Sequence, residues 1–175
     1  MGPRSGCEFW AKSLPAIEGR ISPMWYRVFC RSGQEVKPAD LLAHLQAAGL
    51  VVEGHFRGDD LGWTAAELVV RGGGTPVYVE RYLTEQDDLR ADLNTWAGYL
   101  ETLDYSPNHG MLMEHVIQTR QLFTLRKPID HANDAAVEAV CAAACQFLAG
   151  SVDGVYQIEG EGWYSPAADL LVKEY

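Results

Sequence analysis

The residues best suited to ligand chemistry occupy alternate positions of the predicted strands. Successive side chains of a strand point to opposite faces, so alternating charged and apolar residues sort into two sides of one sheet. Glu67 and Thr124 lie on the charged side, and Trp63 and Trp163 stand where two hairpins return. The candidate ligand-binding residues of this side are Arg27, Glu53, His55, Arg57, Trp63, Arg126, Gln157, Glu159 and Trp163.

This charged side has two interpretations. As a groove, Arg27 and Arg126 would bind a carboxylate or phosphate, because a guanidinium matches both anions with paired N–H donors. Glu53 or Glu159 would accept from a cationic group of the ligand, and the two tryptophans would wall the site by stacking. Without a ligand, the same residues would form a solvated sheet face with cross-strand ion pairs, each contributing about 0.2–1 kcal/mol.

The sequence shows no motif typical of catalysis, metal binding or phosphate binding. His109 and His115 are six residues apart, which places them on different faces of a helix. The glycines at 72–74 are not followed by Gly-Lys-Ser/Thr, and no Gly-x-Ser-x-Gly occurs. Cys141 and Cys145 share one helix face and are interpreted as small buried thiols, with a metal or redox pair as the alternative. We therefore predict no catalytic residue, no metal and no cofactor.

The apolar pattern predicts the strands and helices that would position this face. Strands are expected over 24–31, 50–57, 63–70, 77–83, 121–126 and 155–159, and from Trp163 to Tyr175. Helices are expected over 38–48 with Pro38 in the first turn, from a cap at Thr84 to Leu103, over 111–118, and from a cap at Asp130 or Asp134 to Gly150.

Both ends of the chain show one strand–helix–strand–strand pattern. Each contains a glycine turn ending in Gly-Trp, at 62–63 and at 162–163, followed by Ala-Ala-acidic-Leu-aliphatic-Val at 65–70 and at 167–172. A duplication would let two units bury a face that one cannot bury alone, and the alternative is two hairpins that merely share glycine turns. Tandem units of this kind resemble, in topology, the gyrase-inhibitor-like and SOUL-type proteins. That resemblance implies small-molecule binding in a groove between the repeats. The element order also fits a ferredoxin-like split βαβ arrangement.

The predicted fold class is α+β, with internally duplicated β-α-β-β units that share a largely antiparallel sheet. We expect helices on one face and a helical insert between the repeats. One domain should span 24–175, with repeat 1 at 24–70, a strand and the helical insert at 77–118, and repeat 2 at 121–172. Residues 1–23 are interpreted as an expression-tag remnant or an extension, because Ile17-Glu18-Gly19-Arg20 spells a factor Xa site.

Composition narrows the classes of function. The net charge of −10 argues against binding to nucleic acid or to an anionic membrane surface, since both require basic residues. The four cysteines show no disulfide framework, which favours a cytoplasmic location. We expect a non-catalytic protein-interaction domain, immunity-like or adaptor-like as in many small acidic bacterial domains, with a protein partner or a small anionic ligand. The alternatives are a small-molecule sensor with its ligand between the repeats, and an enzyme with an unfamiliar site.

Overall fold

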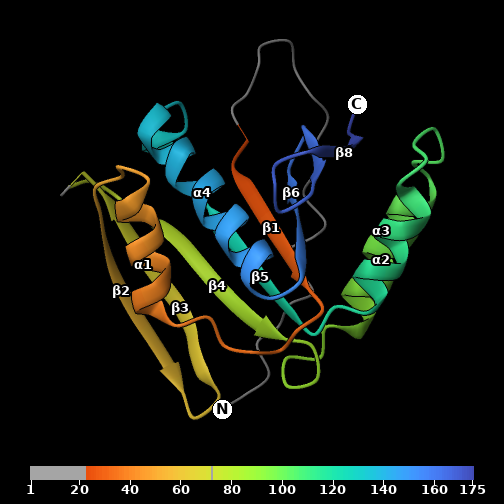
Figure 1. Ribbon diagram of the computed structural model, residues 1–175, viewed down its shortest axis with the longest axis horizontal. Coiled ribbons are helices and arrows are strands. Elements are labelled where there is room, and N and C mark those ends of the chain that lie inside the picture. The colour runs from red at the N-terminus through yellow and green to blue at the C-terminus, as the bar shows by residue number, and fades with distance from the viewer. Residues whose placement is uncertain (1–22, 72) are drawn as a thin grey trace.

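The computed structural model describes residues 23–71 and 73–175, and the elements follow nearly the predicted order (Figure 1). The tetrapeptide at 17–20, and with it the interpretation of the N-terminal segment, lies outside these residues. The strands are β1 (Trp25–Cys30), β2 (Val52–Asp59), β3 (Gly62–Val70), β4 (Val77–Leu83), β5 (Gln121–Arg126), β6 (Gly154–Ile158), β7 (Gly162–Tyr164) and β8 (Leu170–Lys173). The helices are α1 (Pro38–Ala47), α2 (Arg90–Glu101), α3 (His109–Ile117), α4 (Ala135–Ser151) and the short 3₁₀ turn η2 (Ile129–His131).

The strands form one sheet in the order β2-β3-β4-β5-β1-β6-β7-β8, and every neighbouring pair is antiparallel. This topology confirms the predicted α+β class with an antiparallel sheet. The central strands β1 and β5 are paired along their whole length, from Trp25 opposite Arg126 to Cys30 opposite Gln121. These two strands therefore lie side by side at the centre of the sheet, in a fixed register along their full length.

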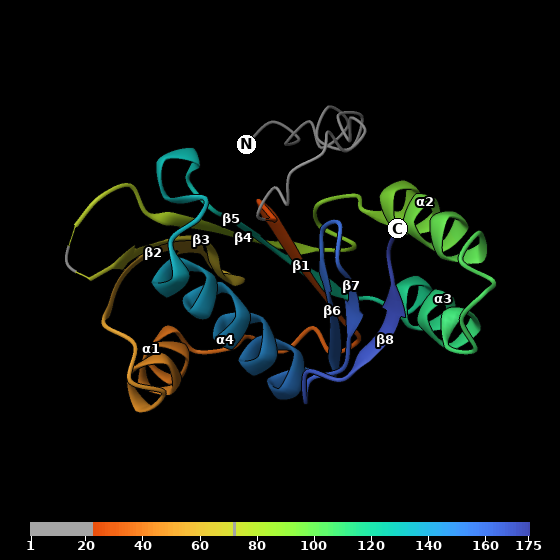
Figure 2. The ribbon, with the colours of Figure 1, turned by 90° about the horizontal axis from the view of Figure 1, so that it is seen from above.

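Helices pack on both faces of the sheet, whereas one helical face was expected. On β1, Val28 packs in the core beneath α1 and α4, while its neighbour Phe29 packs with α2 and α3. Figure 2 shows α1 and α4 on one side and the α2–α3 pair at the end of the sheet that holds β6 to β8. The reason is the stripe of Leu93, Ala97 and Leu100 on α2, which needs an apolar surface. None of the described helices is long and apolar enough to cross a membrane.

The topology does not confirm an internal duplication. In the first unit, β3 is the hairpin strand nearer the central pair β5 and β1, and β4 lies between β3 and that pair. In the second unit, the hairpin strand β6 pairs directly with β1. The two tryptophans of the Gly-Trp turns also face opposite ways. Trp63 lies in the core beneath α1 and α4, and Trp163 in the core beneath α2 and α3. The matching segments thus hold different places in the fold.

Three local features refine the predicted boundaries. Thr84 does not cap a helix, because its hydroxyl donates to the carbonyl of Thr119 at 2.8 Å and α2 begins only at Arg90. The expected last strand is divided into β7 and β8, since Pro166 has no N–H to donate to a sheet. Asp134 is the cap of α4, as one of the two alternatives predicted, and accepts from the N–H of the second helical residue at 2.8 Å.

The predicted buried thiols are confirmed. Cys141 and Cys145 lie with Cys30 in the core beneath α1 and α4, and all three are free and buried. Burial raises the pKa of Cys141 to about 12, so its thiol stays protonated at neutral pH. Within the described ranges, no group of three or more His, Cys, Asp or Glu side chains could hold a metal ion.

Candidate functional site

The strand register aligns most of the predicted site residues into two rows across the sheet. Residues directly opposite each other in an antiparallel pair project from the same face. The first row crosses from β2 to β7 and consists of Arg57, Ala65, Glu80, Thr124, Arg27, Gln157 and Trp163. The second row crosses from β2 to β1 and consists of His55, Glu67, Tyr78, Arg126 and Trp25. Glu53 and Glu159 extend the same face, so it holds every candidate residue except Trp63.

Trp63 projects from the opposite face because the strand pairing slips beside it. The register of β2 and β3 shifts between Arg57 and Gly58. A shift of one residue exchanges the two faces of a strand. The indole of Trp63 enters the core, where its Nε1–H donates to the carbonyl of Val36 at 2.7 Å. Trp63 therefore cannot wall a groove on the charged face.

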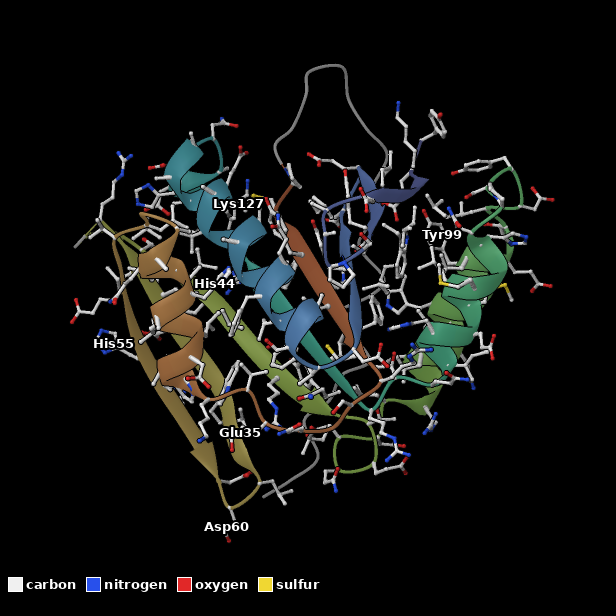
Figure 3. All side chains as sticks on the ribbon, in the orientation of Figure 1. Glu35, His44, His55, Asp60, Tyr99 and Lys127 are labelled. Carbon is white, nitrogen blue, oxygen red and sulfur yellow. The ribbon has the colours of Figure 1, made fainter. Side chains whose placement is uncertain are left out.

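The α2 helix covers the half of the first row that lies on β1, β6 and β7. Arg27, Gln157 and Trp163 are each no more than 5% exposed. Trp96 of α2 lies over Arg27, with 5.1 Å between the guanidinium carbon and the ring centroid. Tyr99, one helical turn away, lies between α2 and the C-terminal strands (Figure 3). Arg27, Gln157 and Trp163, three of the predicted site residues, are thus inside the protein and not on an open surface.

A hydrogen-bonded network joins the covered residues to Glu174 near the C-terminus. Arg27 Nη1 donates to Gln157 Oε1 at 2.9 Å, and Arg27 Nη2 lies 3.8 Å from Glu159 Oε1. Glu174 Oε1 accepts from Gln157 Nε2 at 2.9 Å and from Trp163 Nε1 at 3.1 Å. Burial lowers the pKa of Arg27 and raises that of Glu159, because each charge loses solvating water. The contacts of this half are internal ones, which stabilise the packing of α2 and the last strands on the sheet.

The half of the rows on β2, β3 and β4, together with Arg126 of β5, is open, and it contains a groove of about 210 Å³. Ala65 is the smallest side chain of the first row, and it lies between Arg57 and Glu80. Thr124 continues the row toward the covered half and also lines the groove. The depression therefore arises because one small residue interrupts a line of longer polar side chains.

Arg126 has an unusual position beside this groove. Its guanidinium carbon lies 4.9 Å from the ring centroid of Tyr78 and 5.7 Å from that of Trp25, the two neighbours of Arg126 in the second row. Each such contact at an exposed site contributes about 0.5–1 kcal/mol and restricts the side chain. Within residues 23–71 and 73–175, neither Arg126 nor Arg57 has a hydrogen-bond or ion-pair partner for its guanidinium. Two guanidinium groups thus offer N–H donors to one groove, an arrangement suited to a carboxylate.

Sequence reasoning missed the three aromatic or charged residues that line this groove beside the two arginines. Trp25, Tyr78 and Glu80 were not among the candidates, although they lie in the two rows. The signal was present in β4, where Tyr78 and Glu80 alternate with the buried Val77 and Val79. Sorting this strand by alternation, as was done for the others, would have placed both on the charged face.

No protein-family model, curated protein or solved structure matches the chain. The function is therefore argued from the two rows and their surroundings, because a fold alone does not define what a protein binds.

Proposed function

We propose that this chain is a non-catalytic protein-interaction domain that binds a partner protein through the open half of its charged sheet face. The observation that carries the proposal is the guanidinium of Arg126, which lies between two aromatic rings and has no carboxylate partner in the described part of the chain. Arg126 and Arg57 together would bind an Asp or Glu side chain of the partner. Hydrogen bonds between charged groups are roughly twice as strong as those between neutral ones.

The size of the groove supports a protein side chain as its occupant. Pockets for small molecules typically enclose about 300–1,000 Å³, and this groove has about 210 Å³. The groove would be one anchor within a wider contact, since stable interfaces bury about 800 Å² on each partner. Arginine and aromatic residues are enriched among the side chains that dominate the energy of such contacts.

The charges around the groove restrict the chemistry of the partner. Glu53 and Glu67 flank the two arginines on β2 and β3, on the same face. A complementary segment would carry an acidic side chain for Arg57 and Arg126, with basic side chains beside it for the glutamates. The net charge of −10 would also attract a partner with a basic surface at long range.

The test is a selection from a displayed library of random peptides, followed by titration of the enriched peptides as synthetic molecules. Enriched sequences should contain Asp or Glu flanked by Lys or Arg. Arg126→Ala should weaken their binding by about 1.5–3 kcal/mol, a tenfold loss or more, because charged hydrogen bonds are removed. Arg57→Ala should have a smaller effect, because no aromatic ring of the described residues lies over the Arg57 guanidinium.

Arg71→Ala is the matched control, because Arg71 is an exposed arginine just beyond β3 that does not line the groove. An enriched set without acidic residues, or equal losses for Arg71→Ala and Arg126→Ala, would contradict the proposal. Tight binding of a free carboxylate such as benzoate at Arg126, with no peptide selected, would favour the small-molecule sensor instead.

A further inference from the structure

A second cavity lies at the opposite end of the central strands β1 and β5 from the groove of the open face. It encloses about 820 Å³, within the range of small-molecule sites. Trp25 begins β1 beside the groove of the open face, whereas Arg31 directly follows β1 and lines this cavity. At about 3.3 Å per strand residue, the two sites are roughly 20 Å apart. None of the residues predicted to bind a ligand lines the cavity.

The sheet register brings two arginines of distant sequence together here. Arg31 follows the last residue of β1, and Arg120 precedes the first residue of β5. The pairing of Cys30 with Gln121 and a 2.8 Å bond from the N–H of Arg120 to the carbonyl of Cys30 fix their backbones side by side. Arg90, the first residue of α2, supplies a third guanidinium.

Two of the three arginines are held in place by carboxylates. Arg31 Nε and Nη2 donate to the two oxygens of Asp153 at 2.9 and 3.0 Å. Arg90 Nη2 donates to Glu85 Oε1 at 2.9 Å, and its Nη1 donates to the carbonyl of Ile117 at 3.0 Å. A guanidinium has five N–H donors, so both arginines keep donors for a further acceptor. These pairs orient the two side chains without using all their hydrogen-bonding capacity.

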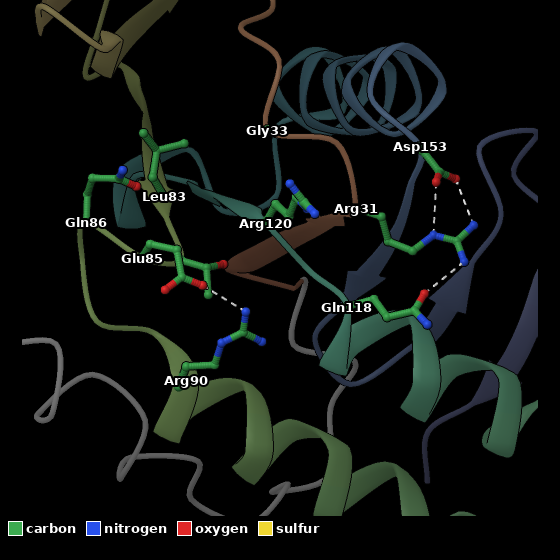
Figure 4. A pocket seen from close by; sticks show the side chains of 10 residues that line it. Arg31, Gly33, Leu83, Glu85, Gln86, Arg90, Gln118, Arg120 and Asp153 are labelled. Carbon is green, nitrogen blue, oxygen red and sulfur yellow. Dashed lines mark hydrogen bonds and ion pairs between the residues drawn. The ribbon is translucent and has the colours of Figure 1, made fainter.

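Arg120 differs from both, because its guanidinium has no hydrogen-bond or ion-pair partner in the described part of the chain. Figure 4 shows Arg120 between the Arg31–Asp153 pair on one side and the Glu85–Arg90 pair on the other. Three positive groups and two negative ones give the cavity a local excess of positive charge, in a chain whose net charge is −10. An anion of the right size would supply the acceptor that Arg120 lacks.

We propose that this cavity is a second binding site, which takes a small polar anion with a phosphate or carboxylate group. Arg120 binds the anionic group directly, and Arg31 and Arg90 contribute their remaining donors. Among the described lining residues, Leu83 is the one large apolar side chain, so the ligand is a polar molecule and not an aromatic or lipid one. The site is independent of the proposed interaction face, since the two share no lining residue.

The test uses isothermal titration of the full chain with three probes: inorganic phosphate, glucose 6-phosphate and citrate. At least one should bind with a Kd of about 1 mM or below, a modest affinity suited to an open, polar site. Arg120→Gln should weaken that binding by tenfold or more, while Arg126→Gln leaves it unchanged. Binding of the phosphates but not citrate assigns a phosphate site, and the converse assigns a carboxylate site.

The proposal is overturned if none of the three probes binds at about 10 mM, a concentration that would detect even weak sites. It is also overturned if Arg120→Gln binds as tightly as the parent chain, or if Arg126→Gln loses as much affinity as Arg120→Gln. Arg120 is exposed, so Arg120→Gln should fold normally. An unchanged melting temperature verifies that the loss of binding is local.

Discussion

Glu174 provides the most direct test of the reasoning about the covered half of the sheet face. It is the penultimate residue of the sequence and is only 9% exposed. Its carboxylate accepts from Gln157, from the indole of Trp163 and from the N–H of Gly160 at 3.0 Å. Burial raises the pKa of Tyr99, and the charge of Glu174 and its hydrogen bond with Tyr99 raise this pKa further. We predict that Glu174→Ala destabilises the fold strongly although it truncates only one terminal side chain.

The magnitude follows from the donors that Glu174→Ala leaves behind. Each buried donor without an acceptor costs about 1–3 kcal/mol, and the Gln157, Trp163 and Gly160 donors would lose theirs. Water can reach part of the site, so the sum falls toward the lower end, at about 3–5 kcal/mol. A chain of this length loses about 2–4 °C of melting temperature per kcal/mol, which predicts a decrease of about 6–20 °C.

Urea unfolding monitored by tryptophan fluorescence measures the loss directly. Glu161→Ala is the control, because Glu161 is an exposed carboxylate near the same turn and should change stability by less than about 0.5 kcal/mol. Glu174→Gln keeps one acceptor oxygen and should give an intermediate loss. If Glu174→Ala costs less than about 1 kcal/mol, the donors are hydrated in the native protein and the network is not a source of stability.

Three further predictions concern single contacts elsewhere in the fold. Burial lowers the pKa of His115, whose Nε2 lies 2.9 Å from the carbonyl of Phe29, with Arg31 and Asp153 as the nearby charges. The unfolded chain therefore binds a proton near pH 6.5 and the folded chain only at lower pH, so stability should fall as the pH decreases from about 7.5 to 5.5. In His115→Gln, the free energy of unfolding measured with urea should depend less on pH between about 7.5 and 5.5. An unchanged pH dependence would mean that other groups cause it. Trp63→Phe should cost about 1–3 kcal/mol by urea unfolding, because the buried carbonyl of Val36 loses its donor; an unchanged midpoint would mean that water replaces the indole. Asp134→Ala removes the acceptor that caps α4, so it should lower the melting temperature at pH 7 and lower it less in acid, below the ordinary aspartate pKa of 3.8. The reason is that the ionised carboxylate stabilises the fold and that the N–H groups it accepts from lower its pKa. An equal decrease at both pH values would contradict that cause.

The local parts of the fold could be predicted from the sequence. The alternation of apolar residues located the strands, Pro38 marked the start of α1, and Asp134, one of two predicted caps, marks the start of α4. The charged face was also predictable in outline, because period-two alternation determines which side chains share a face once the strand is known. These signals are carried by neighbouring residues, which is why they need no knowledge of the rest of the chain.

The predictions that were wrong or not confirmed concern features that depend on contacts between distant segments of the chain. Nothing near Leu93 indicates that the α2 stripe packs against Phe29 and so covers Arg27. Trp63 and Trp163 each follow the last glycine of a turn, yet a register shift in one hairpin directs them to opposite cores. A repeat inferred from sequence therefore matched the local chemistry of two turns and not the order of strands.

The two proposed arginine sites lie at opposite ends of the same central strand, β5. Arg126 is the last residue of β5, and Arg120 directly precedes the first residue of β5, so this short strand has a guanidinium at each end. Between them, Leu122, Phe123 and Leu125 are buried in the two cores. Charges separated by roughly 20 Å interact weakly at physiological salt, where the screening length is about 8 Å. Binding at one site should therefore leave the affinity of the other unchanged, unless a ligand shifts the register of β5. A fixed register is what the paired lengths of β1 and β5 provide, since slipping by one residue would turn every buried side chain of β5 onto the wrong face.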